Sequence, residues 1–261
     1  MLTLADISLA VARIVTPESI VSGTATAGTT TSLTDTVNLT TETARFDKGI
    51  LWVQSGANSG KVLTITGNPS NKLEFATQTD AIAIGDRYSV ARPIYPYNQI
   101  KAAIMQALDD TFVEGEDASL TGDGETLEFN LPSGVWDVIK VRIESATYPE
   151  ENYFSAHWKE QSGKIKFDYG YPPEDDFSIR LYFRDQHPEL TAATSEIDSE
   201  IDTNWLKYKA AENLLLWGMG IYKGAAEYRI EERMNLVLAR MKMLSPRRGG
   251  PVVIMRSPGS V

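Results

Sequence analysis

Three segments of the chain have apolar residues at the spacing of an amphipathic helix. They lie near residues 3–15 and 96–113 and from about 202 to 244, where apolar side chains recur every three or four positions. The apolar positions of the first two are Leu4, Ile7, Val11 and Ile14, and Ile100, Ile104, Leu108 and Phe112. The third segment holds three glycines, which predict a break or kink: Gly218, Gly220 and Gly224.

The two long stretches between these segments have the pattern of β-structure. In residues 20–93, four apolar runs are separated by turn residues, which predicts a small barrel or sandwich. Its threonine-rich start, residues 24–43, has the composition of a linker, but we favour an ordered β-domain because threonine suits strands. In residues 120–187, Gly122-Asp123-Gly124 predicts a hairpin turn and Phe177–Phe183 alternates apolar with polar residues, which predicts a second sandwich.

A first helix this short cannot bury its apolar face alone. We therefore expect an α+β chain in which the N-terminal, middle and C-terminal helices assemble one helical domain carrying two inserted antiparallel β-domains. The expected limits are 1–18, 94–115 and 196–246 for the helical domain, 19–93 and 116–195 for the β-domains, and 247–261 for a C-terminal tail.

Composition and charge narrow the classes of function. The chain has 261 residues and no cysteine, so disulfides and thiolate metal sites are excluded. The net charge is −10, but six cations and no acidic residue follow Glu232, which leaves residues 1–232 at −16. An acidic body repels nucleic-acid phosphates. No apolar run reaches the roughly 20 residues of a membrane span, and the periodic N-terminus does not predict a signal peptide.

Catalytic and metal-binding motifs are weak. The segment Gly56–Lys61 resembles a phosphate loop, but it has three residues between its glycines instead of four, and Val62 follows the lysine, so we predict a hairpin turn. His157 and His187 have no metal-ligand spacing and read as surface or strand-end residues. A Ser–His–Asp triad stays open, although no serine lies in a nucleophile-elbow pattern. We expect no metal, no cofactor and no catalytic residue.

Acidic and aromatic clusters have simple structural explanations. The runs Glu114–Asp117 and Glu174–Asp176 are predicted to be solvated loops, with weak calcium binding as the alternative. Aromatic residues concentrate in the second β-domain, where they fill a core or an interface, or stack on sugars. They are Trp136, Tyr148, Tyr153, Phe154, Trp158, Tyr169 and Tyr171.

The C-terminal tail combines basic and apolar residues, as a docking peptide does. We predict that it binds a partner protein through Arg247, Arg248, Val252, Val253, Ile254, Met255 and Arg256.

Residues 1–113 contain an ordered series of motifs. An N-terminal helix is followed by Ser22-Gly23-Thr24-Ala25-Thr26, Gly49-Ile50-Leu51-Trp52-Val53, Gly56-Ala57-Asn58-Ser59-Gly60-Lys61, Gly85-Asp86-Arg87-Tyr88 and Asn98-Gln99-Ile100-Lys101-Ala102-Ala103-Ile104. In this order the chain resembles the head-to-tail connector proteins of tailed bacteriophages, also called adaptor or neck proteins.

The resemblance implies a non-enzymatic ring, often of twelve copies, that joins the capsid portal to the neck or tail and lines the DNA channel. The helical domain and the tail would contact the portal protein, the β-domains would face the downstream neck or tail protein, and DNA would pass without specific binding. Assembly in the host bacterial cytoplasm, a final place at the head–tail junction of the virion and no contact with a membrane follow from that role. The alternatives are a glycan-binding virion or surface module and, third, a polysaccharide-acting hydrolase or lyase.

Overall fold

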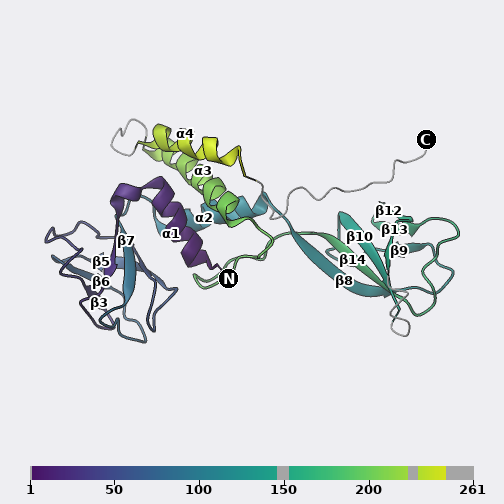
Figure 1. Ribbon diagram of the computed structural model, residues 1–261, viewed down its shortest axis with the longest axis horizontal. Coiled ribbons are helices and arrows are strands. Elements are labelled where there is room, and N and C mark those ends of the chain that lie inside the picture. The colour runs from purple at the N-terminus through teal and green to yellow at the C-terminus, as the bar shows by residue number, and fades with distance from the viewer. Residues whose placement is uncertain (1, 146–152, 223–228, 245–261) are drawn as a thin grey trace. The chain divides into compact units, whose positions relative to one another are not determined.

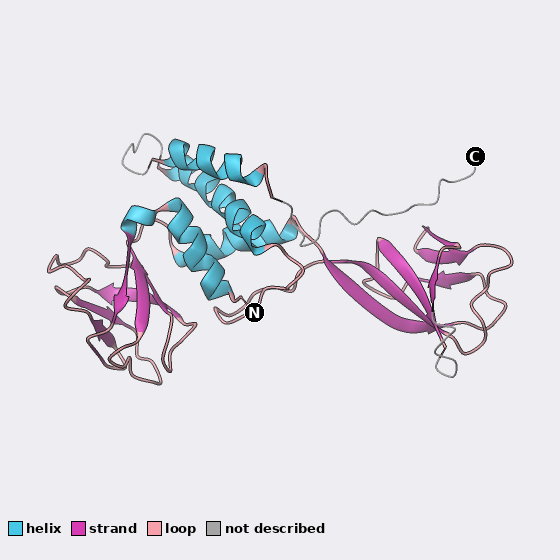
Figure 2. Cartoon of the chain, in the orientation of Figure 1, coloured by secondary structure: helices cyan, strands magenta, loops and turns pink. Residues whose placement is uncertain are grey.

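The computed structural model describes residues 2–145, 153–222 and 229–244, and these form two compact units (Figures 1 and 2). The first unit contains residues 2–110 together with 188–222 and 229–244, and the second contains 111–145 and 153–187. The second unit is therefore an insertion in the sequence of the first.

The first unit contains a seven-stranded antiparallel sheet in the order β1-β7-β4-β5-β6-β3-β2. Its strands are β1 (Ile20–Thr24), β2 (Ala27–Gly28), β3 (Ser32–Thr34), β4 (Ile50–Val53), β5 (Val62–Gly67), β6 (Lys72–Phe75) and β7 (Arg87–Ala91). The prediction of ordered β-structure in the threonine-rich region is confirmed, because β2 and β3 lie there. Side chains from five of these strands, β3 to β7, and from the loops between them form its core, with Leu33, Leu51 and Leu73 fully buried.

Four α-helices are described: α1 (Leu4–Val15), α2 (Tyr97–Asp109), α3 (Thr203–Ile221) and α4 (Ile230–Met241), with a 3-10 turn, η1 (Pro17–Ser19), after the first. Thr3 and Asp6 form the capping box that begins α1, and Asp202 caps α3 by accepting hydrogen bonds from two backbone amides. The helix α3 contacts α1, α2 and α4. It runs through Gly218 and Gly220, where a break was expected, and Gly224 lies outside the described residues. Gly218 instead allows a close approach, since a Cβ there would lie 2.5 Å from the Tyr95 hydroxyl oxygen.

The helix α1 is attached to the sheet by polar contacts as well as by packing. The buried Trp52 indole of β4 donates to the Ser8 hydroxyl (2.8 Å), which donates to the Ala5 carbonyl (2.9 Å). Arg13 donates to the hydroxyls of Ser22 and Ser89, at 3.3 and 3.1 Å. The first helix and the sheet therefore belong to one folding unit.

The expected fold class is wrong. The described chain is mostly β, in three antiparallel sheets of seven, four and three strands with four α-helices, and it is not organised as a helical domain with β-insertions. The physical reason is that the apolar face of the short first helix is covered partly by the sheet, through contacts such as that between Ser8 and Trp52. The helices share a compact unit with the seven-stranded sheet.

The second unit packs a four-stranded sheet, in the order β11-β10-β14-β8, with a three-stranded sheet, in the order β12-β13-β9. The strands are β8 (Val113–Thr121), β9 (Glu128–Asn130), β10 (Val138–Glu144), β11 (Tyr153–Ser155), β12 (Trp158–Gln161), β13 (Lys164–Phe167) and β14 (Ser178–Asp185). Both sheets contribute to one core, which includes the fully buried Val141, Ile165 and Leu181. The sandwich-like core agrees with the alternation in Phe177–Phe183.

Two local predictions in this region are wrong. Gly122-Asp123-Gly124 does not close a hairpin, because β8 pairs with β14 whereas β9 pairs with β13. The turn instead connects two sheets, and Asp123 accepts hydrogen bonds from Glu125 and Thr126. Phe112 does not extend the second helix, which ends at Asp109; its ring lies 4.4 Å from the Arg184 guanidinium.

Candidate interaction surfaces

Exposed aromatic side chains concentrate on the second unit. Their exposed fractions range from 50% for Trp136 and Tyr153 to 95% for Tyr169, with Phe154 at 59% and Tyr171 at 56%. The core of the unit is filled by other residues, mainly Val, Ile, Leu and Phe from both sheets. These five aromatics therefore expose much of their surface outside that core, and Trp and Tyr are among the residue types enriched at protein interface hot spots.

Two of the exposed tyrosines lie on a turn that follows β13. The Tyr171 amide donates to the Asp168 carbonyl (3.1 Å), and the Asp168 amide donates to the His157 carbonyl (3.0 Å). Gly170 has a φ of +89°, which an L-residue rarely adopts. The His157 ring stacks on Tyr171 with centroids 3.9 Å apart, and its Nδ1 lies 3.6 Å from a carboxylate oxygen of Asp168. The turn therefore holds Tyr171 in place against the histidine.

The acidic run Glu114–Asp117 is not a loop, as was expected, but part of β8. Glu114 pairs with Lys140 (2.9 Å), and Glu116 pairs with Arg180. Gly115 lies between them beneath Phe183, where a Cβ would meet the ring at 2.6 Å. Glu114 and Glu116 lie on either side of this packed glycine, so these two carboxylates share one face of the strand. The second acidic run, Glu174–Asp176, does lie outside the strands, as expected.

Cations and carboxylates alternate across this face of the four-stranded sheet. Arg180 lies between Glu116 and Glu144. Its hydrogen bonds to these carboxylates, chiefly that to Glu144, raise the pKa of its guanidinium. Arg184 pairs with Asp137 at 2.9 Å. Aromatic rings accompany three of the cations at this sheet: Tyr182 with Lys140, Phe154 with Arg142, and Phe112 with Arg184. The cations are thus neutralised by neighbouring carboxylates and do not form a basic patch of the kind that binds nucleic-acid phosphates.

The phosphate-loop-like segment is a turn between β4 and β5, as predicted. The Asn58 side chain is buried; it donates to the Asp80 carbonyl (2.9 Å) and accepts from the Lys61 ammonium (2.7 Å). Gly56 has a φ of +79°, and a Cβ there would lie 2.1 Å from an Asp86 carboxylate oxygen. The lysine and the asparagine are therefore engaged within the loop.

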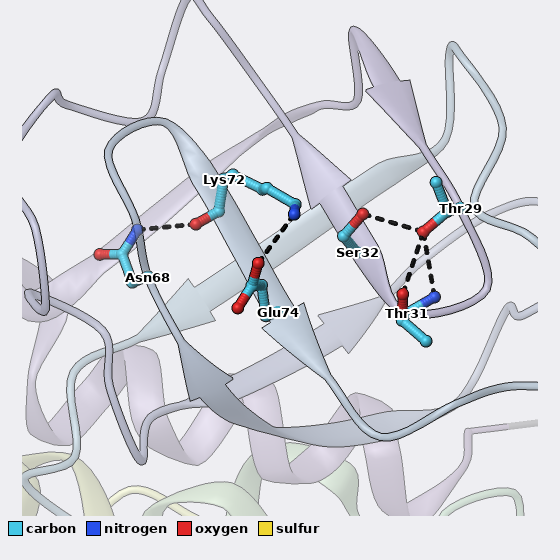
Figure 3. Close-up of polar contacts among 6 residues, drawn as sticks. All are labelled: Thr29, Thr31, Ser32, Asn68, Lys72 and Glu74. Carbon is cyan, nitrogen blue, oxygen red and sulfur yellow. Dashed lines mark hydrogen bonds and ion pairs between the residues drawn. The ribbon is translucent and has the colours of Figure 1, made fainter.

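The hydroxyl groups of the threonine-rich region are also engaged with neighbouring groups. Thr29 exchanges a hydrogen bond with the Ser32 hydroxyl (2.9 Å) and accepts one from the Thr31 amide (3.1 Å), as Figure 3 shows. On the neighbouring strand β6, Lys72 pairs with Glu74 at 2.7 Å. This surface is a satisfied polar network at the edge of the sheet.

A buried carboxylate lies inside the first unit. Asp35 accepts hydrogen bonds from the Tyr88 hydroxyl and the Asn38 side-chain amide, both at 2.8 Å, and from the backbone amides of Val37 and Asn38. Burial raises the pKa of Asp35, but these hydrogen bonds outweigh it and hold the pKa below its ordinary value. Burial is the main cause that raises the pKa of Tyr88, and the hydrogen bond to the Asp35 carboxylate raises it further. With every carboxylate lone-pair direction occupied by a neighbour in the loop or sheet, the group has a structural role.

The remaining expectations about chemistry concern metals and the tail. Within residues 2–145, 153–222 and 229–244, no group of three or more histidine and carboxylate side chains is arranged to hold a metal ion. Among the helices in those ranges, none combines the length and the apolar character that crossing a bilayer requires. The predicted docking residues lie outside the described part of the chain: Arg247, Arg248, Val252, Val253, Ile254, Met255 and Arg256.

The chain matches no protein-family model, and no curated protein is significantly similar to it.

Proposed function

We propose that this protein is a structural virion protein, an adaptor that assembles as a ring between the capsid portal and the neck or tail of a tailed bacteriophage. The observation that carries the proposal is the exposure of five large aromatic side chains on a second unit whose core other residues fill. Such residues contribute most of the binding energy in protein interfaces when they become buried. A module that presents them suits a protein whose work is to contact other proteins.

Two properties of the sequence support the same role. The order of motifs in residues 1–113 resembles that of phage connector proteins. The charge of −16 on residues 1–232 suits a channel wall that DNA must pass without being held, because like charges repel. In this proposal the basic and apolar tail, residues 247–261, docks on the portal, and exposed aromatic residues of the second unit contact the downstream neck or tail protein.

Electron microscopy of the purified full chain, mixed with the portal protein of the same phage, tests the proposal. We expect a ring of adaptor subunits on the portal, and we expect deletion of residues 247–261 to abolish that complex while leaving the thermal unfolding of the adaptor unchanged. Replacing Tyr169 and Tyr171 with serine should leave portal binding intact, because those residues are assigned to the other contact. A chain that stays monomeric and binds no portal, even at high concentration, would refute the proposal.

A glycan-binding module is the second candidate, and the tyrosine turn is the observation that favours it. Pyranose rings stack on exposed aromatic faces, and a carboxylate such as Asp168 can accept hydrogen bonds from sugar hydroxyls. A glycan array separates the two candidates. Binding that disappears in Tyr169→Ala would support the module, whereas an adaptor should bind none of the glycans.

A further inference from the structure

The helix α4 is fixed to the first unit by one of its faces. Ile230, Met234 and Val237 are buried at the spacing of a single helical face, and α4 contacts α3 (Figure 1). Arg233 forms an ion pair with Glu18, in which its Nη2 donates to both carboxylate oxygens, at 2.9 and 3.2 Å. The rest of the helix surface is thereby held in a defined orientation.

A second set of residues, the α4 stripe, runs along a different side of the same helix. Its members are three or four positions apart and so share one side: Arg229, Glu232, Leu236, Arg240 and Met243. Leu236 is 51% exposed, and Met243, in the turn after the helix, is 83% exposed. Arg229 and Glu232 form an ion pair at 2.8 Å in which both side chains are more than half exposed. The stripe is an apolar centre with charged flanks, open to solvent.

The charges of the α4 stripe are arranged symmetrically about Leu236. Glu232 precedes it by four residues and Arg240 follows it by four, so each lies about 6 Å along the helix axis from the centre. If two such helices pack antiparallel through Leu236, Glu232 of each faces Arg240 of the other. Parallel packing would instead bring like charges together, which is unfavourable.

We propose that a second copy of this chain covers the α4 stripe, forming a twofold dimer of the free protein with Leu236 at its axis. A twofold contact uses the same patch on both subunits and therefore needs a patch that complements itself. The α4 stripe satisfies this condition in charge, with Leu236 at the centre and an acidic and a basic residue four positions to either side. The dimer is a state of the unassembled chain and does not depend on portal binding.

The absence of cysteine from the sequence allows a direct geometric test in the full-length protein. A Leu236→Cys variant places two thiols across the proposed axis, where a disulfide requires Cα atoms roughly 4.4–6.8 Å apart. Mild oxidation should convert it to a covalent dimer on a non-reducing gel. The matched control is Leu238→Cys, since Leu238 is 40% exposed on another side of α4; it should stay monomeric on the same gel. Equal cross-linking of the two variants would overturn the proposal.

Charge exchange tests the pairing independently. Sedimentation over a concentration series should show a monomer–dimer equilibrium whose dissociation constant rises roughly 30-fold in Glu232→Arg, because two attractive ion pairs become repulsive. Adding Arg240→Glu to the same chain should restore the dissociation constant of the wild type, because each pair again joins opposite charges. Glu231→Arg is the control, since it removes an acidic residue from the same helical turn on a different side.

Three results would overturn the dimer: a monomer at every concentration, a double variant as weak as the single one, or loss of the dimer on deleting residues 245–261. The last would identify the tail as the contact. The proposed adaptor function would survive each of them if rings still form on the portal.

Discussion

Removing the Tyr88 hydroxyl should measurably destabilise the first unit. In Tyr88→Phe the ring still fills its fully buried site, so no cavity forms, but Asp35 loses one of the four hydrogen bonds to its carboxylate. A hydrogen bond to a charged group contributes about 1.5–3 kcal/mol. Water cannot replace the hydroxyl, because Asp35 has no exposed surface. For a unit of this size, such a loss lowers the Tm by roughly 4–10 °C.

Urea or thermal unfolding is monitored by tryptophan emission in a variant that also carries Trp136→Phe and Trp158→Phe. These two substitutions remove the tryptophans of the second unit, so the remaining ones report on the first unit. Tyr169→Phe is the control: it makes the same chemical change at a side chain that is 95% exposed, and should change the free energy of unfolding by less than about 0.5 kcal/mol. If Tyr88→Phe lowers the free energy of unfolding no more than this control does, the Tyr88–Asp35 hydrogen bond does not stabilise the fold.

The pH dependence of this cost provides a second check. The pKa of Asp35 is lowered on folding, so its stabilising contribution is present above the pKa of the unfolded chain, near 3.8, and is lost as the pH falls through the lower folded value. Tyr88→Phe removes one cause of that depression. The difference in free energy of unfolding between the wild type and Tyr88→Phe should therefore shrink as the pH falls below about 4. A difference that stays constant under acid would contradict the assigned role of the charge.

Three further experiments test the packing. Gly218→Ala should destabilise the protein by about 1–2 kcal/mol, because the new Cβ would lie 2.5 Å from a buried tyrosine hydroxyl, whereas Gly220→Ala, with open space around it, should stabilise the same helix by up to about 1 kcal/mol; equal effects in thermal unfolding would contradict this. Ser8→Ala leaves the buried Trp52 indole without its acceptor and should cost about 1–3 kcal/mol in urea unfolding; a neutral result would mean that the contact does not stabilise α1 on the sheet. Residues 111–187 expressed alone should unfold cooperatively by circular dichroism, because β8 and β14 bring the ends of this segment together; gradual, non-cooperative melting would show that the unit depends on the rest of the chain.

Regular periodicity was a sound guide to individual elements. The run Ile50–Val53 coincides with β4, and Thr3 and Asp6 cap α1 as the sequence pattern suggests. The architecture did not follow from these elements, because the residue that covers part of α1, Trp52, comes from a strand more than forty positions away. Local periodicity indicates that a face is apolar, but it does not identify which distant segment covers it.

Charged strands and exposed apolar residues were the hardest to predict. The acidic run Glu114–Asp117 has the composition of a loop, and only the pairing of its carboxylates with Lys140 and Arg180 across the sheet accounts for a strand. Leu236 is apolar and adjoins the buried Val237, yet it lies on another side of α4 and is half exposed. The opposite charges four residues to either side of it, Glu232 and Arg240, indicate an exposed contact site. A search for apolar periodicity does not use charges.

Exposed groups of this protein differ in how far they are already satisfied, and this difference bears on where partners bind. On the four-stranded sheet, Lys140, Arg180 and Arg184 each have a carboxylate within ion-pair distance, so a partner would have to break those pairs before gaining new ones. The Tyr169 side chain and the central leucine of the α4 stripe need no such exchange, because burying an exposed apolar group is favourable by itself. Partner contacts are therefore expected at the tyrosine turn and along α4 before they are expected on the charged sheet face.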